Sequence, residues 1–258
     1  MFFKIINNLI TDFYKIEILR TSIVLIRFLF LFKILGRNFK FKNKVEVVDD
    51  HITIHRDNKI LSVDDHNLHY SENLINLKKT YNKFSGSKTK ILTMPLCSID
   101  FLNFEKAKIL SVGPRNESEL YFIRSLGFQW KNISSIDLIS YSSKIKLGDI
   151  HDTNYTDNQF DVIVCGWVIT YSNNYRKILD EIYRIAKNKA IICIGYTYMP
   201  EAKDKMRQYK TSENRFDTNQ QIIAHYGNKI KNIYFNFDAY KDNKDYKRHS
   251  IFIFRLNK

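Results

Sequence analysis

The chain has 258 residues, of which 44% are hydrophobic and 14% aromatic, and its mean hydropathy is -0.34. These values exclude a disordered chain and a protein embedded in a membrane, and a chain of this length can bury one substantial core. The formal charge of +14 is distributed over a sequence rich in Lys, Ile, Asn and Tyr, so it does not by itself indicate a nucleic-acid partner.

Three cysteines, Cys97, Cys165 and Cys193, are widely spaced and form no C-x-x-C pair. Their number and spacing argue against a disulfide framework and against a thiolate metal site. Cys165 and Cys193 lie in apolar runs, so we expect them to be small buried core residues. This use of cysteine fits a cytoplasmic location.

The first 35 residues are strongly apolar and predict one or two helices. The densest part, Ile18–Leu35, contains Arg20, Arg27 and Lys33. A cation at mid-membrane costs about 2.5 to 3.5 kcal/mol and a good apolar residue returns only about 0.3 to 0.6, so we do not expect a membrane-spanning helix. Three alternatives stay open: burial against the domain, pairing within a homo-oligomer, and peripheral contact with a membrane.

Alternating residues between Val45 and Val63 predict a small antiparallel hairpin. Four histidines lie near it in sequence, at His51, His55, His66 and His69. No cysteine or carboxylate completes a recognised ligand pattern with them, so we expect no metal site. A helix and a loop follow from Glu72 onward. We therefore divide the chain into an extension over residues 1–100 and an α/β domain over residues 101–258.

A strand, a tight turn and a helix open the second part. Residues 108–112 are apolar and end at Gly113, and a helical pattern over residues 117–126 ends at Gly127. The turn contains one glycine only. Pro114 and Arg115 hinder the close backbone approach that a pyrophosphate needs, which disfavours a dinucleotide and a dinucleotide-dependent oxidoreductase. A cofactor without phosphate stays compatible.

Two acidic positions follow at later strand ends. Asp137 ends a strand 24 residues after Gly113, close to the roughly 20 residues expected for a carboxylate that binds a ribose diol. Twelve residues further, Asp149 and Ile150 provide an acceptor and an apolar surface, which an adenine ring requires. The run Phe160–Cys165 is apolar throughout and predicts a strand buried on both faces.

Between Lys106 and Tyr198 these marks resemble the class I S-adenosylmethionine-dependent methyltransferases, in the small-molecule, methyltransferase type 11-like branch. The resemblance implies a Rossmann-like α/β fold whose sheet is mainly parallel. Residues 178–187 resemble the family's helix before the fifth strand, and residues 190–194 resemble that strand. Residues 229–237 and 249–256 resemble the antiparallel pair that closes this fold.

By position, the resemblance implies a binding site for S-adenosylmethionine. Its residues would be Gly113 with Pro114 and Arg115, Asp137 with Leu138, Asp149 with Ile150, and Cys165, Gly166 and Trp167 at the end of the fourth strand. The chain departs from the family pattern at Ser111, where an acidic residue is common, and at Arg115 and Glu117, where further glycines are common.

His151 is the first candidate for a general base, and Tyr171 is a second polar candidate. The leading function is methyl transfer to a small-molecule or glycan-type acceptor. The alternative is a non-catalytic scaffold or partner-binding protein on the same fold. No Asn-Pro-Pro-Tyr or Asp-Pro-Pro-Tyr segment follows the fourth strand and no RNA-binding module is recognisable, so we do not expect a nucleic-acid acceptor. Residues 1–100 and the insertion at 199–226 would determine the acceptor.

Overall fold

The computed structural model describes residues 26, 44–48, 51–56, 59–63, 87–114, 117–138, 143–172, 174–198, 215–239 and 248–258. Within them, three short strands form a small sheet of their own: β1 (Lys44–Val48), β2 (His51–Arg56) and β3 (Lys59–Val63). Both pairs in this sheet are antiparallel, in the order β1-β2-β3. The predicted hairpin is therefore confirmed, with a third strand added to it. The helices predicted within residues 1–35 and after Glu72 lie outside the described residues.

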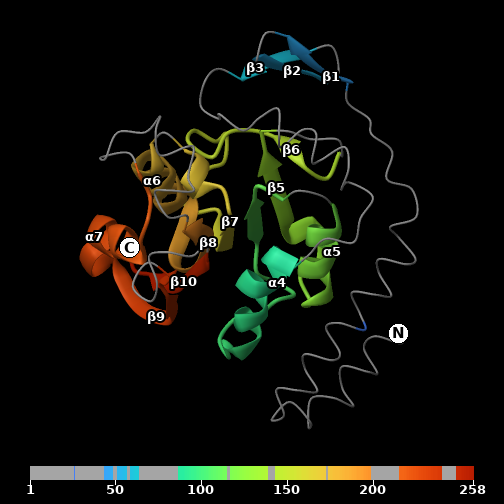
Figure 1. Ribbon diagram of the computed structural model, residues 1–258. Coiled ribbons are helices and arrows are strands. Elements are labelled where there is room, and N and C mark those ends of the chain that lie inside the picture. The colour runs from blue at the N-terminus through green and yellow to red at the C-terminus, as the bar shows by residue number, and fades with distance from the viewer. Residues whose placement is uncertain are drawn as a thin grey trace, which may run out of the picture.

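The main sheet has seven strands in the order β6-β5-β4-β7-β8-β10-β9 (Figure 1). Its strands are β4 (Ile109–Val112), β5 (Ile133–Asp137), β6 (Lys146–Leu147), β7 (Phe160–Gly166), β8 (Ala186–Tyr198), β9 (Ile230–Phe237) and β10 (Arg248–Leu256). The pairs from β6 to β8 are parallel, and β10 is antiparallel to both β8 and β9. The predicted parallel sheet with a closing antiparallel pair is confirmed.

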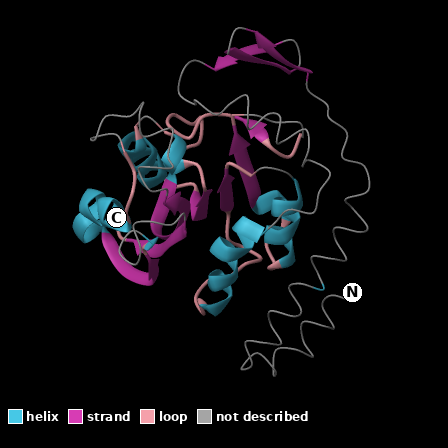
Figure 2. Cartoon of the chain, viewed as in Figure 1, coloured by secondary structure: helices cyan, strands magenta, loops and turns pink. Residues whose placement is uncertain are grey.

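Helices cover both faces of this sheet, which gives three layers (Figure 2). The described helices are α4 (Ser87–Thr93), α5 (Glu117–Ser125), α6 (Tyr175–Ile185) and α7 (Asn219–Tyr226). Residues of α4 and α5 join one buried cluster with the sheet, and residues of α6 and α7 join the other. Each helix places its apolar side chains toward the sheet and so removes them from water.

Strand β7 lies at the centre of the sheet, which explains its continuous apolar sequence. Val162 and Val164 belong to the cluster with α4 and α5, and Ile163 and Cys165 belong to the cluster with α6. Burial raises the pKa of the Cys165 thiol to about 12. Cys97, Cys165 and Cys193 are all buried, so the predicted burial of Cys165 and Cys193 is confirmed.

Helix α4 precedes the predicted domain boundary at residue 100 but packs on the main sheet. Leu92 in α4 and Leu96 in the following 3₁₀ turn are fully buried in the cluster with α5. The packed α/β unit therefore includes residues from Ser87 onward, and the division at residue 100 stays a prediction. None of the helices in the described part of the chain combines the length and the apolar character needed to cross a membrane.

Candidate cofactor-binding site

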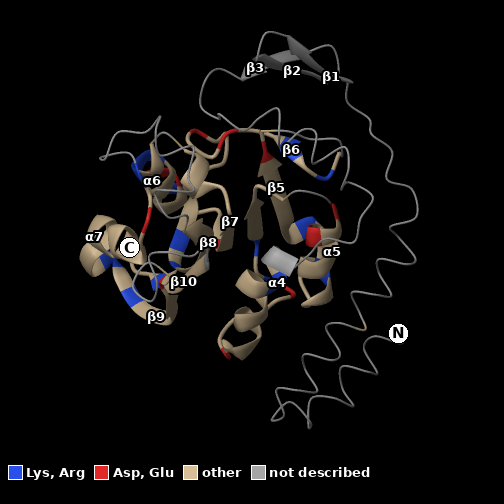
Figure 3. Ribbon diagram, viewed as in Figure 1, with Lys and Arg blue, Asp and Glu red and all other residues tan. Residues whose placement is uncertain are grey.

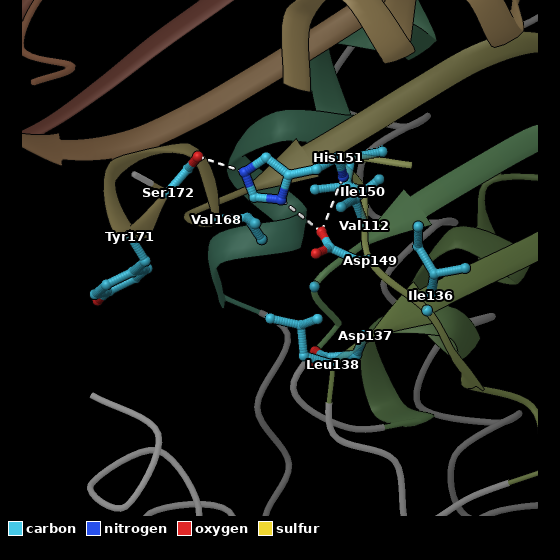
Figure 4. A pocket seen from close by; sticks show the side chains of 12 residues that line it. Val112, Ile136, Asp137, Leu138, Asp149, Ile150, His151, Val168, Tyr171 and Ser172 are labelled. Carbon is cyan, nitrogen blue, oxygen red and sulfur yellow. Dashed lines mark hydrogen bonds and ion pairs between the residues drawn. The ribbon is translucent and has the colours of Figure 1, made fainter. Parts of the chain in front are cut away.

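A pocket lies where the parallel strands β4, β5 and β6 end and the loop after β7 begins (Figure 4). Open α/β sheets bind their ligands at this carboxyl edge. The lining residues are Val112, Gly113, Ile136, Asp137, Leu138, Gly148, Asp149, Ile150, His151, Val168, Tyr171 and Ser172. They come from segments far apart in the sequence that parallel strand pairing brings together.

Gly113 forms the turn after β4 with a backbone conformation that few other residues adopt. Its φ is +70°, and a Cβ atom at this position would lie 2.2 Å from Cγ2 of Val168. Its N–H donates to the carbonyl oxygen of Ile136 at 2.9 Å, which ties the turn to β5. Only glycine combines this left-handed conformation with the close approach of the loop after β7.

Asp137 ends β5 at the pocket wall, and its neighbour Leu138 lines the pocket beside it. The carbonyl oxygen of Asp137 accepts a hydrogen bond from the N–H of Gly148 at 3.1 Å. This bond continues the pairing of β5 with β6 and fixes the start of the Gly148–His151 loop next to Asp137. The two acidic positions predicted from the sequence, Asp137 and Asp149, therefore line the same pocket.

A chain of hydrogen bonds links Asp149, His151 and Ser172 across the pocket (Figure 4). Oδ1 of Asp149 accepts from the backbone N–H of His151 at 2.9 Å and lies 2.6 Å from Nδ1 of the ring. Nε2 of the ring lies 2.5 Å from Oγ of Ser172. Oγ of Ser172 also accepts from the N–H of Asn174 at 2.9 Å. His151 thus connects the loop after β6 to the loop after β7.

The pocket has an electrostatic character opposite to that of the whole chain. Among its described lining residues, Asp137 and Asp149 are carboxylates and none is Lys or Arg, although the chain as a whole has a formal charge of +14. In Figure 3 acidic positions gather along this edge of the sheet, at the end of β5 and in the loops beside β6. Two carboxylates attract a cation and hydrogen-bond donors, and they repel a phosphate.

Glu117 replaces one of the family's glycines, and the structure gives it a separate structural role. It begins α5, where a negative charge is favourable, and Oε2 of Glu117 lies 3.0 Å from Nζ of Lys144. Burial alone would lower the pKa of Lys144, but the hydrogen bond and charge of Glu117 outweigh it and raise that pKa. Glu117 does not line the pocket.

The structure brings together most of the residues predicted for the site. The predicted residues that line the pocket are Gly113, Asp137, Leu138, Asp149, Ile150, His151 and Tyr171. Pro114, Cys165, Gly166 and Trp167 are not among the lining residues, and Arg115 lies outside the described residues. The ring of Tyr171 extends away from His151 in Figure 4. The role of each of these residues in binding or catalysis stays a prediction.

Trp167 instead points to the other half of the sheet. It has a φ of +59°, and its backbone N–H donates to the carbonyl oxygen of Gly195 at 2.6 Å. Its indole N–H donates to Oγ1 of Thr197 at 2.8 Å and to Nδ1 of His249 at 3.2 Å. The strained conformation of Trp167 turns the chain so that Val168, the next residue, reaches the pocket.

Sequence reasoning missed four side chains of the pocket: Val112, Ile136, Val168 and Ser172. Val112 and Ile136 directly precede Gly113 and Asp137, which the sequence analysis predicted for the site. Their position at the ends of predicted strands could therefore have identified them. Val168 and Ser172 follow β7 in a short irregular segment. Their sequence carries no signal, because their position depends on the turn at Trp167.

Comparison with known proteins gives one match in sequence. Residues 127–194 match the family model described as "Methyltransferase domain". This segment runs from the end of α5 into β8 and contains both acidic pocket residues, but it begins after Gly113. No curated protein matches the chain.

Several solved structures are similar to the chain. A SAM-dependent methyltransferase from Aquifex aeolicus is 12% identical, with 70% of this chain and 97% of that chain covered and a TM-score of 0.43. A SAM-dependent methyltransferase from Thermotoga maritima is 13% identical, with 74% and 99% covered and a TM-score of 0.44. The CurJ carbon methyltransferase is 9% identical, with 66% and 54% covered and a TM-score of 0.49.

The family match and the sheet order support the same assignment. The matched segment contains the parallel strands β5, β6 and β7. Strand β10 lies between β8 and β9 and is antiparallel to both, as the resemblance implies for the closing strands of this sheet. Residues 127–194 thus match a methyltransferase domain model, and the sheet built around them has the strand arrangement that the resemblance to class I S-adenosylmethionine-dependent methyltransferases implies.

Proposed function

We propose that this chain binds S-adenosylmethionine in the pocket at the ends of β4, β5 and β6 and transfers its methyl group to a small-molecule or glycan-type acceptor. The observation that carries this proposal is the acidic pocket in a basic protein. Asp137 and Asp149 face a space whose described lining contains no Lys or Arg. Such a site suits a cationic adenosyl cofactor and disfavours the pyrophosphate of a dinucleotide.

The residues of the pocket fit the parts of this cofactor. The carboxylate of Asp137 can accept two hydrogen bonds from a ribose diol, and the carboxylate of Asp149 can accept one from an adenine amine. Ile136 and Ile150 provide apolar surfaces for the flat base. Gly113 lines the pocket at the turn after β4, where its backbone can contact the methionine part.

When bound, the cofactor supplies an electrophilic methyl group on a sulfonium with a good leaving group. The task of the protein is then to hold the acceptor in line with that methyl group and to exclude water. The loop after β7 lines the pocket through Val168 and Ser172. We propose that this loop separates the cofactor from the acceptor.

His151 stays our first candidate for moving a proton. Asp149 binds Nδ1, which orients the ring, and Nε2 lies against the hydroxyl group of Ser172. An acceptor can therefore reach Nε2 only by replacing Ser172 or by passing its proton through that hydroxyl group. Tyr171, at the same loop, is our second candidate.

The alternative function is a non-catalytic scaffold or partner-binding protein. The observation that favours it is the single glycine of the turn after β4, together with Ser111 and Glu117 at positions where the family usually has an acidic residue and a glycine. Ser111 is buried in β4 and Glu117 is bound to Lys144, so both positions contribute to the structure. A scaffold would retain the fold without turnover.

Mass spectrometry and a turnover assay decide between the two functions. Native mass spectrometry of the purified chain is expected to show a co-purifying adenosyl ligand. The chain incubated with S-adenosylmethionine carrying a labelled methyl group and a panel of small hydroxyl, amine and sugar acceptors is expected to label at least one acceptor. The Asp137→Asn variant should weaken both signals, and the Asp152→Asn variant, which changes an exposed neighbouring carboxylate, should keep them. Ligand binding without any transfer would support the scaffold.

We also propose a peripheral membrane contact through the apolar N-terminal segment. The proposal is supported by Arg20, Arg27 and Lys33 and by a basic run that contains Arg37, Lys40, Lys42 and Lys44. Co-sedimentation with anionic liposomes tests it. The intact chain is expected to sediment with the liposomes. Equal behaviour of a variant that lacks residues 1–44 would contradict the proposal.

A further inference from the structure

The two edges of the main sheet are built differently. β6 forms one edge with two residues, whereas β9 forms the other with eight. Among the residues that the structure describes, no strand pairs with the outer side of β9 (Figure 1). A long edge strand offers unpaired N–H and C=O groups to a second strand, and proteins usually shorten, charge or cover such edges.

The side chains of β9 do not protect this edge. Residues 231–237 are all exposed, and the strand contains no proline. The exposed fractions of its large apolar side chains are 47% for Ile233, 38% for Tyr234, 43% for Phe235 and 38% for Phe237. Lys231 is the one charged residue in this segment. The ring of Phe101, also exposed, lies 6.5 Å from that of Tyr234 and extends the apolar surface.

These apolar side chains lie on both faces of the sheet. Residues paired directly across antiparallel strands project to the same face. Phe235 pairs with Ile253, which belongs to the cluster with α4 and α5. Ile233 pairs with Phe254, which belongs to the cluster with α6 and α7. A helix or a flat lipid surface covers one face of a sheet, whereas a strand added at the edge contacts side chains on both faces.

We propose that β9 pairs with β9 of a second copy of this chain, antiparallel about a two-fold axis, so that the two main sheets become continuous. The pairing of β9 with β10 shifts register between Phe235 and Ile233, so that Tyr234 is an extra residue at this point of the strand. With the axis between Ile233 and Tyr234, each of these residues faces the other across the junction. Lys231 then faces Asn236 of the second copy, so no like charges oppose each other. Aromatic residues opposite β-branched residues stabilise such a strand pair.

This interface is separate from the cofactor pocket. Three strands, β7, β8 and β10, lie between β9 and β4, whose end forms the pocket. A second copy bound at β9 therefore leaves the pocket open. The interface can be tested without cofactor or acceptor, and it does not depend on the proposed function.

Sedimentation-velocity ultracentrifugation of the intact chain gives the first test. The monomer has a mass of 30.8 kDa, and we expect a species of twice that mass at micromolar concentration. Phe235→Lys places a charge on the edge and should raise the dissociation constant of the dimer at least tenfold. Ile91→Lys changes an equally exposed apolar residue on α4 and should leave the dimer unchanged. The thermal midpoints of both variants should match that of the parent chain, which separates dissociation from unfolding.

Cysteine cross-linking gives a second test that does not weaken the edge. The three natural cysteines are buried, so a new cysteine at an exposed position is the accessible thiol. Tyr234→Cys lies beside the proposed axis, and mild oxidation should convert it to a disulfide-linked dimer within minutes. Ile91→Cys should stay monomeric under the same conditions.

Several results would overturn the proposal. A monomer at every concentration up to 100 µM would do so, as would a dimer that Phe235→Lys leaves intact and Tyr234→Cys fails to cross-link. A dimer that forms only after removal of residues 1–44 would show that the chain's own N-terminal segment covers β9. Sedimentation with anionic vesicles that Phe235→Lys abolishes, without any dimer in solution, would show that lipid covers it.

Discussion

The two halves of the main sheet have different roles in the molecule. In the pocket half, β4, β5 and β6 have four, five and two residues; a glycine follows β4 and β6, and β5 ends at Asp137. In the other half, β8, β10 and β9 have thirteen, nine and eight residues. Short strands leave backbone and carboxylate groups at an open edge, where a ligand can bind. Of these long strands, β8 and β10 bury side chains on both faces and stabilise the domain.

The largest expected effect on stability lies in the half with long strands. Phe254 in β10 is fully buried, and its ring centroid lies 4.9 Å from that of Phe252 and 5.5 Å from that of Tyr226. Phe254→Ala should lower the free energy of unfolding by about 4 kcal/mol, because it removes this packing and leaves a cavity. Urea denaturation measures the loss. Ile91→Ala, at an exposed residue of α4, should change it by less than about 0.5 kcal/mol.

A second prediction concerns the contact between the pocket loops and α6. Glu181 in α6 accepts hydrogen bonds from the N–H of Thr153 at 2.9 Å and from Nε of Arg184 at 2.8 Å. Burial alone would raise the pKa of Glu181, but the hydrogen bonds from Arg184 and Thr153 outweigh it and lower that pKa below its ordinary value of 4.5. Glu181→Gln should lower the free energy of unfolding at pH 7 by about 2 kcal/mol.

The pH dependence of this effect has a definite direction. A carboxylate whose pKa is lowered by folding contributes stability above its unfolded pKa, and this contribution is lost as the pH falls through the folded pKa. The parent chain and Glu181→Gln should therefore differ at pH 7 and converge below the ordinary value of 4.5. Denaturation at several pH values measures this. A constant difference down to pH 3 would contradict the assigned cause.

In the pocket half, Gly113 should affect both binding and stability. Gly113→Ala forces a side chain into a left-handed conformation, which costs about 1 to 2 kcal/mol, and places it against Val168. Because this contact adds to the backbone cost, we expect a loss of stability of at least this size and a cofactor affinity at least tenfold weaker. Calorimetry and urea denaturation measure the two effects. The matched control is Gly227→Ala, which also has a positive φ but no neighbouring atom within 4 Å and lies far from the pocket in the sequence. It should affect stability alone.

The smallest effect on stability is expected for Asp137→Asn, a variant that should change ligand binding in the pocket half without weakening the fold. Asp137→Asn should weaken cofactor binding about tenfold, or about 1.4 kcal/mol, through loss of a charged acceptor for the ribose. Because Asp137 lies at the pocket wall and is only half-buried, the free energy of unfolding should change by less than about 0.5 kcal/mol. A large loss of stability instead would show that Asp137 is a structural residue.

The sequence predicted the buried strands, which have strong local patterns, better than it predicted the contacts between side chains in the pocket. The apolar run Phe160–Cys165 was predicted because burial on both faces leaves a continuous pattern, and the closing strands were predicted from the family resemblance. Asp137 and Asp149 were predicted because strand ends are marked by the change from apolar to polar residues. The partnership of His151 with Ser172 could not be predicted, since it joins residues 21 positions apart through an irregular turn at Trp167.

The edge at β9 shows a similar limit. The sequence predicts the strand, and its apolar residues read as part of a core. Only the sheet order shows that these residues lie at an edge and stay exposed. Strand order depends on contacts between distant segments, so a local pattern does not determine it.

Isothermal titration calorimetry with S-adenosylmethionine and its demethylated product tests the central claim most directly. The claim predicts one binding site per chain for each ligand, and Asp137→Asn should weaken binding about tenfold while Asp152→Asn leaves it unchanged. No heat and no thermal shift with either ligand at millimolar concentration would contradict the claim that this pocket binds an adenosyl cofactor.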